Sequence, residues 1–204
     1  MYYGGNNHGS IVEIGGQWYI FYHRQTNGHH YSRQGCAEPI RFRGDGSIVQ
    51  AEMTSCGLNG GPLIGRGEYP AHIACNLFCK DEELYVGTYG AWMDGRFPKI
   101  TQDGKDGDEE PGYIANMRDS ATAGFKYFDC RGVKRVKIKV RGYAKGVFEV
   151  KTAWDGPAHG VIPVDFTNIW KEYAADIAIP DGVHALYFTY RGEGNAQLKS
   201  FALE

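Results

Sequence analysis

Charge excess, long apolar runs and an export signal are all missing from this sequence of 204 residues. The 22 lysines and arginines stand against 24 aspartates and glutamates, for a formal charge of −2. Composition therefore gives no electrostatic case for a nucleic acid or a membrane surface as partner. No apolar run approaches the roughly 18 residues of a membrane span. The opening residues, MYYGGNNHGS, have neither the basic start nor the apolar core of a signal peptide, and the compartment stays open.

Paired cysteines, phosphate-binding loops and helical periodicity are missing as well. The five cysteines form no CxxC pair, and Cys75 and Cys79 are spaced CxxxC without a matching second half. An odd count without a framework predicts mostly free, buried thiols rather than a zinc site. No glycine-rich loop leads into a helix, which removes the usual signal for nucleotide binding.

Aromatic residues and glycine are abundant, at 14% and 29 residues, and both suit β-structure with many turns. Strand-like runs recur about every 8–12 residues, as in an antiparallel sandwich. In VKRVKIKVRG, Val136, Ile138 and Val140 alternate with basic residues, which predicts a strand with one wet face. The glycine-rich stretch SCGLNGGPLIGRGEYP has no periodicity, and we place a domain boundary there, near Gly65.

The segment from Asn6 to Met53 holds about four predicted strands. Two of them, SIVEI and WYIFYHR, meet at Gly15-Gly16, and a hairpin surrounds Gly44-Asp45-Gly46. This pattern is typical of one blade of a β-propeller. A lone blade leaves apolar surface in water, so we expect this segment to belong to something longer. In this chain alone we expect it either to fold back on the sandwich or to associate with another chain.

The stretch NNHGSIVEIGGQWYIFYHR, followed by CAEPIRFRGDGSI, resembles the last blade of the five-bladed propeller of glycoside hydrolase family 43. That family includes arabinofuranosidases, xylosidases and arabinan-cleaving enzymes. The stretch ITQDGKDGDEEPGYIANMRDSATAGFKYFDC resembles the start of the sandwich that follows the propeller in one branch of the family, and the remainder is similar to carbohydrate-binding module family 6. The resemblance implies an all-β chain: a truncated last blade over residues 1–65, then an antiparallel β-jelly roll over residues 66–204.

The same resemblance implies an inverting glycosidase that uses an acid, a base and a tuning carboxylate from earlier blades. None of the three has a counterpart here, so we predict no catalytic residue and no activity for this chain alone. The carboxylates of the blade, Glu13, Glu38, Asp45 and Glu52, show no spacing of a catalytic pair, and we interpret them as strand-face or turn residues.

His8 matches a family histidine on the floor of the propeller pocket that often helps to hold a metal ion, and a role in hydrogen bonding is the alternative. We expect a metal role for His8 only in an intact propeller. His23 and Arg24 match the family motif YHR and are interpreted as packing and hydrogen-bonding elements. No cofactor is expected to be required, although the intact propeller could take calcium.

In the jelly roll, the family pattern implies a cleft where two rings hold a sugar face and an amide orients it. Trp170 matches the loop tryptophan and Tyr113 is the second ring, with core packing as the alternative for each. The amide position falls at Gln197, where the family usually has Asn, and Asn195 is a nearby substitute. Should Trp170 not bind, Trp92 and Trp154 are the next candidates.

The sandwich calcium site of the family is not expected here. Cys75 and Lys199 stand where acids are usual, and lysine cannot ligate a hard cation. The acidic stretch from Asp103 to Glu110 is interpreted as a solvated loop.

Three interpretations remain open: a piece of a family 43 enzyme, a stand-alone module that weakly binds xylan or arabinan, and a structural sandwich that binds no sugar. The expected partner is plant polysaccharide or oligosaccharide such as xylan, arabinan or arabinoxylan, with self-association through the exposed blade and neither nucleic acid nor membrane.

Overall fold

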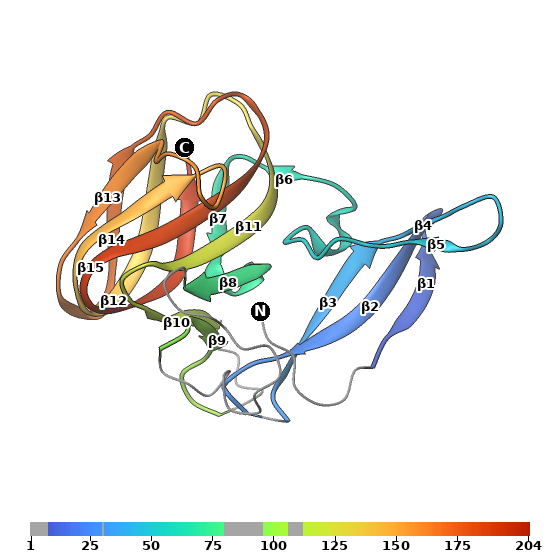
Figure 1. Ribbon diagram of the computed structural model, residues 1–204, viewed down its shortest axis with the longest axis horizontal. Helices are drawn as coiled ribbons and strands as arrows, with labels where there is room; N and C mark the ends of the chain where they lie inside the picture. Colours follow the sequence, from blue (N-terminus) through green and yellow to red (C-terminus); the bar gives the residue numbers. More distant parts are fainter. Residues whose placement is uncertain (1–7, 30, 80–95, 106–111) are drawn as a thin grey trace.

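The computed structural model describes residues 8–29, 31–79, 96–105 and 112–204 (Figure 1). Strands dominate these residues, and their only helices are the short 3-10 turns η1 (Gly57–Asn59) and η2 (Ala71–Ile73). The all-β prediction is therefore confirmed. No helix in the described part of the chain is long and apolar enough to cross a membrane.

The N-terminal sheet has three antiparallel strands in the order β1 (Ser10–Ile14), β2 (Gln17–Gln25) and β3 (Arg33–Pro39). The tight turn between β1 and β2 places Gly15 and Gly16 at φ of 59° and 83°, which glycine adopts without a Cβ clash. The predicted hairpin around Asp45 forms a separate ribbon of β4 (Arg41–Phe42) and β5 (Ile48–Val49). Instead of one sheet of about four strands, the segment thus forms a three-stranded sheet and a ribbon.

The other strands of the described residues form one ten-stranded sheet that folds over on itself (Figure 1). Its members are β6 (Leu63–Ile64), β7 (Gly67–Pro70), β8 (Asn76–Cys79), β9 (Lys99–Thr101), β10 (Tyr113–Met117), β11 (Ala121–Cys130), β12 (Arg135–Lys151), β13 (Gly160–Val164), β14 (Thr167–Asp176) and β15 (Gly182–Leu203). The first half of β12 and the second half of β15 lie between β14 and β7. Their other halves lie between β13 and β11. The result is a sandwich of two layers that share two long strands.

Glycines let these two long strands cross from one layer to the other. An added Cβ at Gly142, where φ is 130°, would lie 2.4 Å from the Asn195 carbonyl oxygen, and one at Gly194 only 1.8 Å from that of Tyr143. Each position therefore requires glycine. The strands β12 and β15 each run through these glycines as one strand.

The core lies between the two layers and is rich in phenylalanine. Five phenylalanine rings there are at most 1% exposed: Phe125, Phe128, Phe148, Phe188 and Phe201. Four of them contact one another at centroid distances of 4.7 to 5.7 Å, and Phe148 contacts Tyr190 at 5.3 Å. All five cysteines are free, as predicted, and burial raises the pKa of Cys130 to about 11. A thiol with such a pKa is unreactive at neutral pH.

A polar junction joins the N-terminal sheet to the sandwich. Arg24 is 3% exposed, and its guanidinium donates to the backbone carbonyls of His72 and Ala74. This confirms the hydrogen-bonding role expected for Arg24. Further along, the Ser55 amide donates to the Lys126 carbonyl at 2.5 Å, and the Lys126 amide donates to the Ser55 hydroxyl at 3.1 Å.

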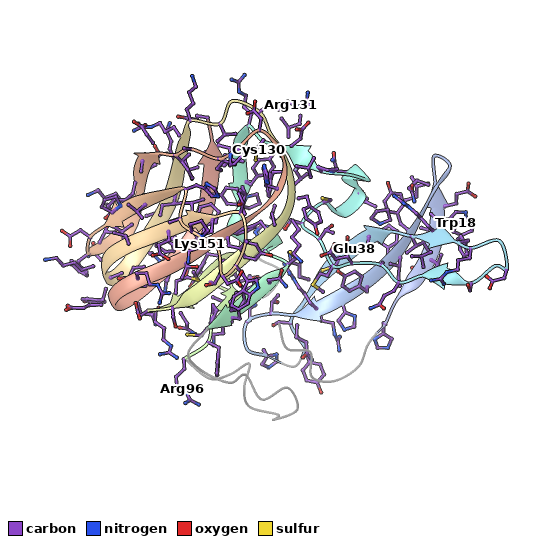
Figure 2. The ribbon with its side chains drawn as sticks, turned by 45° about the horizontal axis from the view of Figure 1, so that its top comes forward. Trp18, Glu38, Arg96, Cys130, Arg131 and Lys151 are labelled. Carbon is purple, nitrogen blue, oxygen red and sulfur yellow. The ribbon has the colours of Figure 1, made fainter. Side chains whose placement is uncertain are left out.

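The strand β6 pairs with β11, so the sandwich sheet begins just before the boundary expected near residue 65. Figure 2 shows Glu38 on the side of the N-terminal sheet that faces the sandwich and Trp18 toward its far end.

Candidate functional site

The predicted sugar cleft lies on the polar face of the layer that contains β14, β12 and β15. Arg141 and Gln197 are direct cross-strand partners, so their side chains share this face. The buried residues Val140 and Leu198 precede and follow them and point into the core. Alternation along the strands therefore brings polar side chains to the place where the cleft was expected.

The two candidate rings lie together. The centroids of Tyr113 and Trp170 are 5.3 Å apart with an interplanar angle of 66°, an edge-to-face contact. Tyr113 is buried and Trp170 is half-buried. Because the rings touch each other, they do not form an open clamp for a sugar ring in this conformation.

Arg141 fills the space beside both rings. Its guanidinium carbon lies 4.2 Å from the Trp170 centroid and 5.1 Å from the Tyr113 centroid, within cation–π range of each. The amine of Lys199 approaches Trp170 from 5.3 Å as well. The tryptophan that we expected to meet a sugar is therefore already in contact with two cations of the chain.

Polar contacts hold Arg141 in this position. Its Nη2 donates to Asp103 Oδ1 at 2.7 Å and its Nε to Gln197 Oε1 at 2.5 Å. The hydrogen bond from Arg141 lowers the pKa of Asp103 below its usual range. Burial, with the nearby Asp103 charge, raises the pKa of Tyr113, whose hydroxyl donates to the same carboxylate at 3.2 Å. We call Tyr113, Trp170, Arg141, Gln197 and Asp103 the arginine-filled slot.

Three of the five members of this slot were predicted as site residues, whereas Arg141 and Asp103 were not. Tyr113, Trp170 and Gln197 gather there, but Gln197 accepts from Arg141, which occupies the oxygen that was expected to orient a sugar. Arg141 was read only as one of the basic residues on a wet strand face. Its register opposite Gln197 was the signal that could have identified it.

Asn195 is not part of the slot. It pairs across the strands with Tyr143, one row along the same face, and its amide donates to Asn116 Oδ1 at 3.4 Å. Of the fallback tryptophans, Trp154 is 47% exposed and packs against Phe78. Trp92 lies outside the described residues, as do residues 106–110 of the acidic stretch.

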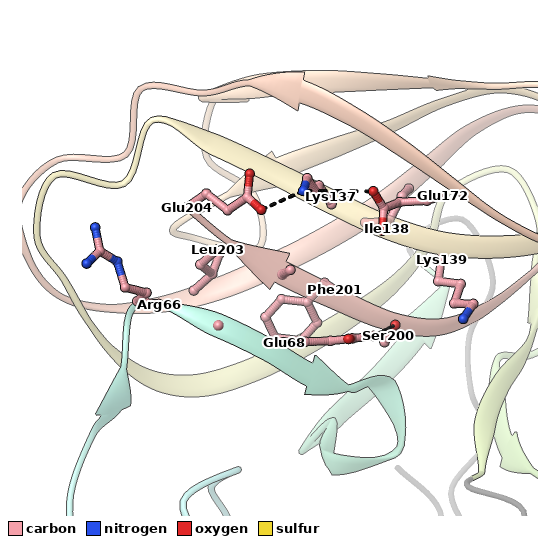
Figure 3. A pocket seen from close by; sticks show the side chains of 12 residues that line it. Arg66, Glu68, Lys137, Ile138, Lys139, Glu172, Ser200, Phe201, Leu203 and Glu204 are labelled. Carbon is pink, nitrogen blue, oxygen red and sulfur yellow. Dashed lines mark hydrogen bonds and ion pairs between the residues drawn. The ribbon is translucent and has the colours of Figure 1, made fainter.

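A second hollow on this face is a groove of about 480 Å³ between β7, β12, β14 and β15 (Figure 3). Lys137 bridges Glu204 at 2.6 Å and Glu172 at 3.9 Å there, and the Ser200 hydroxyl donates to Glu68 at 2.7 Å. These polar groups satisfy one another, so the groove offers few unpaired groups to a ligand.

The N-terminal sheet borders a third hollow, of about 530 Å³, that contains Glu38. Burial raises the pKa of Glu38, as in many catalytic acids. Yet its oxygens accept three hydrogen bonds: from the Thr54 amide at 2.8 Å, the Thr54 hydroxyl at 2.6 Å and the Tyr22 hydroxyl at 3.1 Å. Glu38 therefore anchors the chain that leaves β5.

The other three carboxylates of the N-terminal segment are a turn residue, an ion-pair partner and an exposed strand residue. Asp45 accepts from the amide and hydroxyl of Ser47, which closes the hairpin turn. Glu52 binds Lys126 at 2.8 Å and the Tyr127 hydroxyl at 2.9 Å. Glu13 is exposed on β1.

His8 is exposed at the start of β1, and its ring stacks on His23 at 5.8 Å. Within the described ranges no group of three or more His, Cys, Asp or Glu side chains could hold a metal ion. Two imidazoles alone do not suit calcium, which takes oxygen ligands, so the described residues do not form such a site. At the family's sandwich calcium position, Cys75 is buried and its thiol donates to the Gly124 carbonyl at 3.5 Å.

No protein-family model matches the chain. Among curated proteins, a xylosidase/arabinosidase from Thermoclostridium stercorarium is 73% identical over 203 residues, which is 100% of this chain and 43% of that protein. An arabinoxylan arabinofuranohydrolase from Paenibacillus polymyxa is 26% identical over 96% of this chain and 30% of its own length. The chain thus spans less than half the length of these relatives.

Solved structures give the fold of each part. A glycoside hydrolase family 43 arabinoxylan arabinofuranohydrolase from Bacillus subtilis, in complex with cellotetraose, matches 98% of this chain over 41% of its own, with a TM-score of 0.60 and 20% identity. A family 6 carbohydrate-binding module from Clostridium stercorarium, with cellobiose, matches 71% of this chain and 98% of its own, with a TM-score of 0.55 and 15% identity. The first match spans the N-terminal sheet and the sandwich together, and the second covers a complete module.

Proposed function

We propose that this chain, a segment of a glycoside hydrolase family 43 protein with a sandwich of the carbohydrate-binding module family 6 type, serves an enzyme that releases arabinose or xylose from plant polysaccharide. The 73% identity to a xylosidase/arabinosidase over the whole chain carries this proposal. The match to an arabinoxylan arabinofuranohydrolase supports it. The family's catalytic carboxylates have no counterpart here, so the chemistry belongs to a part of the enzyme outside this chain.

Within that enzyme, the role of the sandwich is to brace the last blade of the propeller. The junction supports this role, because the buried Arg24 guanidinium of β2 satisfies two carbonyls of the sandwich. Nearby, the Ser55 amide donates to the Lys126 carbonyl and the Lys126 amide donates to the Ser55 hydroxyl. Contacts of this kind fix the orientation of two units, so the sandwich moves with the blade rather than on a flexible tether.

A chimera tests this proposal. The matching segment of the Thermoclostridium stercorarium relative is replaced by this chain, which at 73% identity should fold in its place. We expect the chimera to hydrolyse aryl xylosides or aryl arabinofuranosides at a rate within about threefold of the unmodified relative. A chimera that shows a folded circular dichroism spectrum but no activity, while the relative is active, would contradict the proposal.

The alternative function, weak binding of xylan or arabinan oligosaccharides, is favoured by one observation: two rings and an amide gather in the arginine-filled slot. Arg141 opposes it, because a sugar would have to displace the guanidinium from both rings and from Asp103. We therefore propose that the slot is closed to sugar in the native chain.

The variant Arg141→Ala should open the slot. A stack on one exposed ring contributes about 1 kcal/mol beyond burial. Together with the burial itself and a hydrogen bond from the amide, the total should reach about −4 kcal/mol, so we expect binding of xylohexaose with a dissociation constant on the order of 1 mM. Titration followed by the indole N–H chemical shift of Trp170 measures it, and Lys145→Ala, on the same strand outside the slot, is the matched control. A saturable shift of the Trp170 indole N–H that persists in Tyr143→Ala, with Arg141 still present, would contradict a closed slot.

A further inference from the structure

An exposed aromatic pair lies one row from the arginine-filled slot. The Tyr143 and Phe166 centroids are 4.6 Å apart and their planes differ by 32°, a tilted stack. Tyr143 is 77% exposed and Phe166 51% exposed. Two large rings that contact each other in water, rather than in the core, require an explanation, because burial would be more favourable.

The chain holds this pair in place. Phe166 lies in the two-residue connection between β13 and β14, where its amide donates to Asp165 Oδ1 at 2.9 Å. The hydroxyl of Tyr173 donates to the Asp165 carbonyl at 2.7 Å. Tyr143 follows Gly142, at the crossing of β12 and β15. Both rings are therefore presented by backbone that is fixed before any ligand arrives, which lowers the entropic cost of binding.

An amide lies at the edge of the pair. Asn195 is the direct cross-strand partner of Tyr143, so the two side chains share a face. Its amide nitrogen donates to Asn116, and no group among the described residues donates to its side-chain oxygen. The next row beyond carries Lys145 opposite Glu193, whose charges offset each other. A ring surface with an uncharged amide at its rim suits a neutral, hydroxylated ring ligand.

The row resembles the slot beside it in having an aromatic ring from the β14 end and an amide from β15. In the slot, Trp170 comes from β14 and Gln197 from β15; in the next row Phe166 precedes β14 and Asn195 lies on β15. On β12, Arg141 belongs to the slot and Tyr143 to the next row, and the two rows are two residues apart along β12 and β15, about 7 Å. The first row is filled by Arg141, whereas the second is open to solvent.

We infer that Tyr143, Phe166 and Asn195 form a sugar-binding platform, on which one neutral pyranose or furanose ring of a xylan- or arabinoxylan-type oligosaccharide stacks. The sugar ring stacks on the outer face of Tyr143, the more exposed ring, which Phe166 supports from the other side, and hydroxyls at the sugar's edge donate to the Asn195 side-chain oxygen. The chemical class of the sugar rests on the proposed function; the position of the platform rests on the geometry alone.

Titration of the full chain with xylohexaose, arabinoxylo-oligosaccharide and cellohexaose, followed by amide chemical shifts, tests the platform. We expect millimolar binding with shifts at residues 143, 166 and 195, and about tenfold weaker binding for Tyr143→Ala and for Phe166→Ala. Tyr31→Ala is the matched control, because Tyr31 is 73% exposed but lies near the N-terminal sheet. It should bind like the native chain.

Loss of binding in Trp170→Ala but not in Tyr143→Ala would place the ligand in the slot and overturn the platform. So would the absence of binding by all three sugars at high millimolar concentration. A shift from dimer to monomer on Tyr143→Ala in sedimentation, without sugar binding, would identify a second copy as the occupant and also overturn it. Binding of cellohexaose alone at these residues would support the platform and count against the arabinose- or xylose-directed proposal.

Discussion

The N-terminal sheet and the sandwich differ in how far they bury their apolar side chains. In β1, the neighbours Ile11 and Val12 are 42% and 41% exposed although they point to opposite faces. In the sandwich, Phe125 and Phe188 are fully buried between two layers that belong to the same chain. The sandwich therefore completes its own core, whereas the sheet presents apolar surface on both faces, as a propeller blade does between its neighbours.

The largest expected contrast between the two regions comes from removing one ring from each. Phe125→Ala leaves a cavity in a closed core and should lower the free energy of unfolding by about 3–5 kcal/mol. Trp18→Ala removes a larger ring that is 38% exposed and should cost less than about 1 kcal/mol. Urea unfolding followed by circular dichroism compares them, and equal costs would mean that the N-terminal sheet has a closed core of its own.

The junction between the N-terminal sheet and the sandwich gives the next largest expected change in the free energy of unfolding. Arg24→Ala leaves the Ala74 carbonyl and Gln34 Oε1 without this donor, while the His72 carbonyl keeps only its hydrogen bond from Gln34, and we expect a loss of about 3 kcal/mol. Arg33→Ala, on the exposed face of β3, is the control and should stay within about 0.5 kcal/mol. Urea midpoints of the two variants measure the difference. Similar midpoints would show that the two regions are not coupled through Arg24.

A smaller, pH-dependent effect concerns the slot. The Asp103 pKa is lowered by the Arg141 hydrogen bond, so the pair stabilises the fold above the ordinary value of 3.8 and this contribution is lost as pH falls through the lowered pKa. Trp170 fluorescence, which senses Arg141, should therefore change below pH 3.8 in the native chain. In Asp103→Asn this step should be missing. The same step in both proteins would assign it to another group.

Local patterns predicted the elements whose partners lie nearby. The Gly15-Gly16 turn and the alternation of Val136, Ile138 and Val140 both hold in the structure. The strands β6 and β7 were missed, because their sequences lie in a glycine-rich stretch without periodicity. They pair with β11 and β15, far along the chain, and such tertiary pairing leaves no local signal.

In the candidate site, too, residues that belong to a local motif were predicted, and residues brought together by tertiary pairing were missed. Tyr113, Trp170 and Gln197 were predicted from a family resemblance and do come together. The position of Arg141 over both rings follows from its register in β12 and from a carboxylate at Asp103, which no single motif contains. Tyr143 and Phe166 were missed because the strand and the loop that carry them meet only in the folded sandwich.

Native-state hydrogen exchange tests most directly whether the N-terminal sheet is a blade that lacks its neighbours. Amides of β1 and β2 are compared with those of β12 and β15, in this chain alone and in the chimera with the relative's remaining segment. We predict weak protection of β1 and β2 in the chain alone, strong protection in the chimera, and unchanged strong protection of β12 and β15 in both. Equal protection of all four strands in the chain alone would contradict this account.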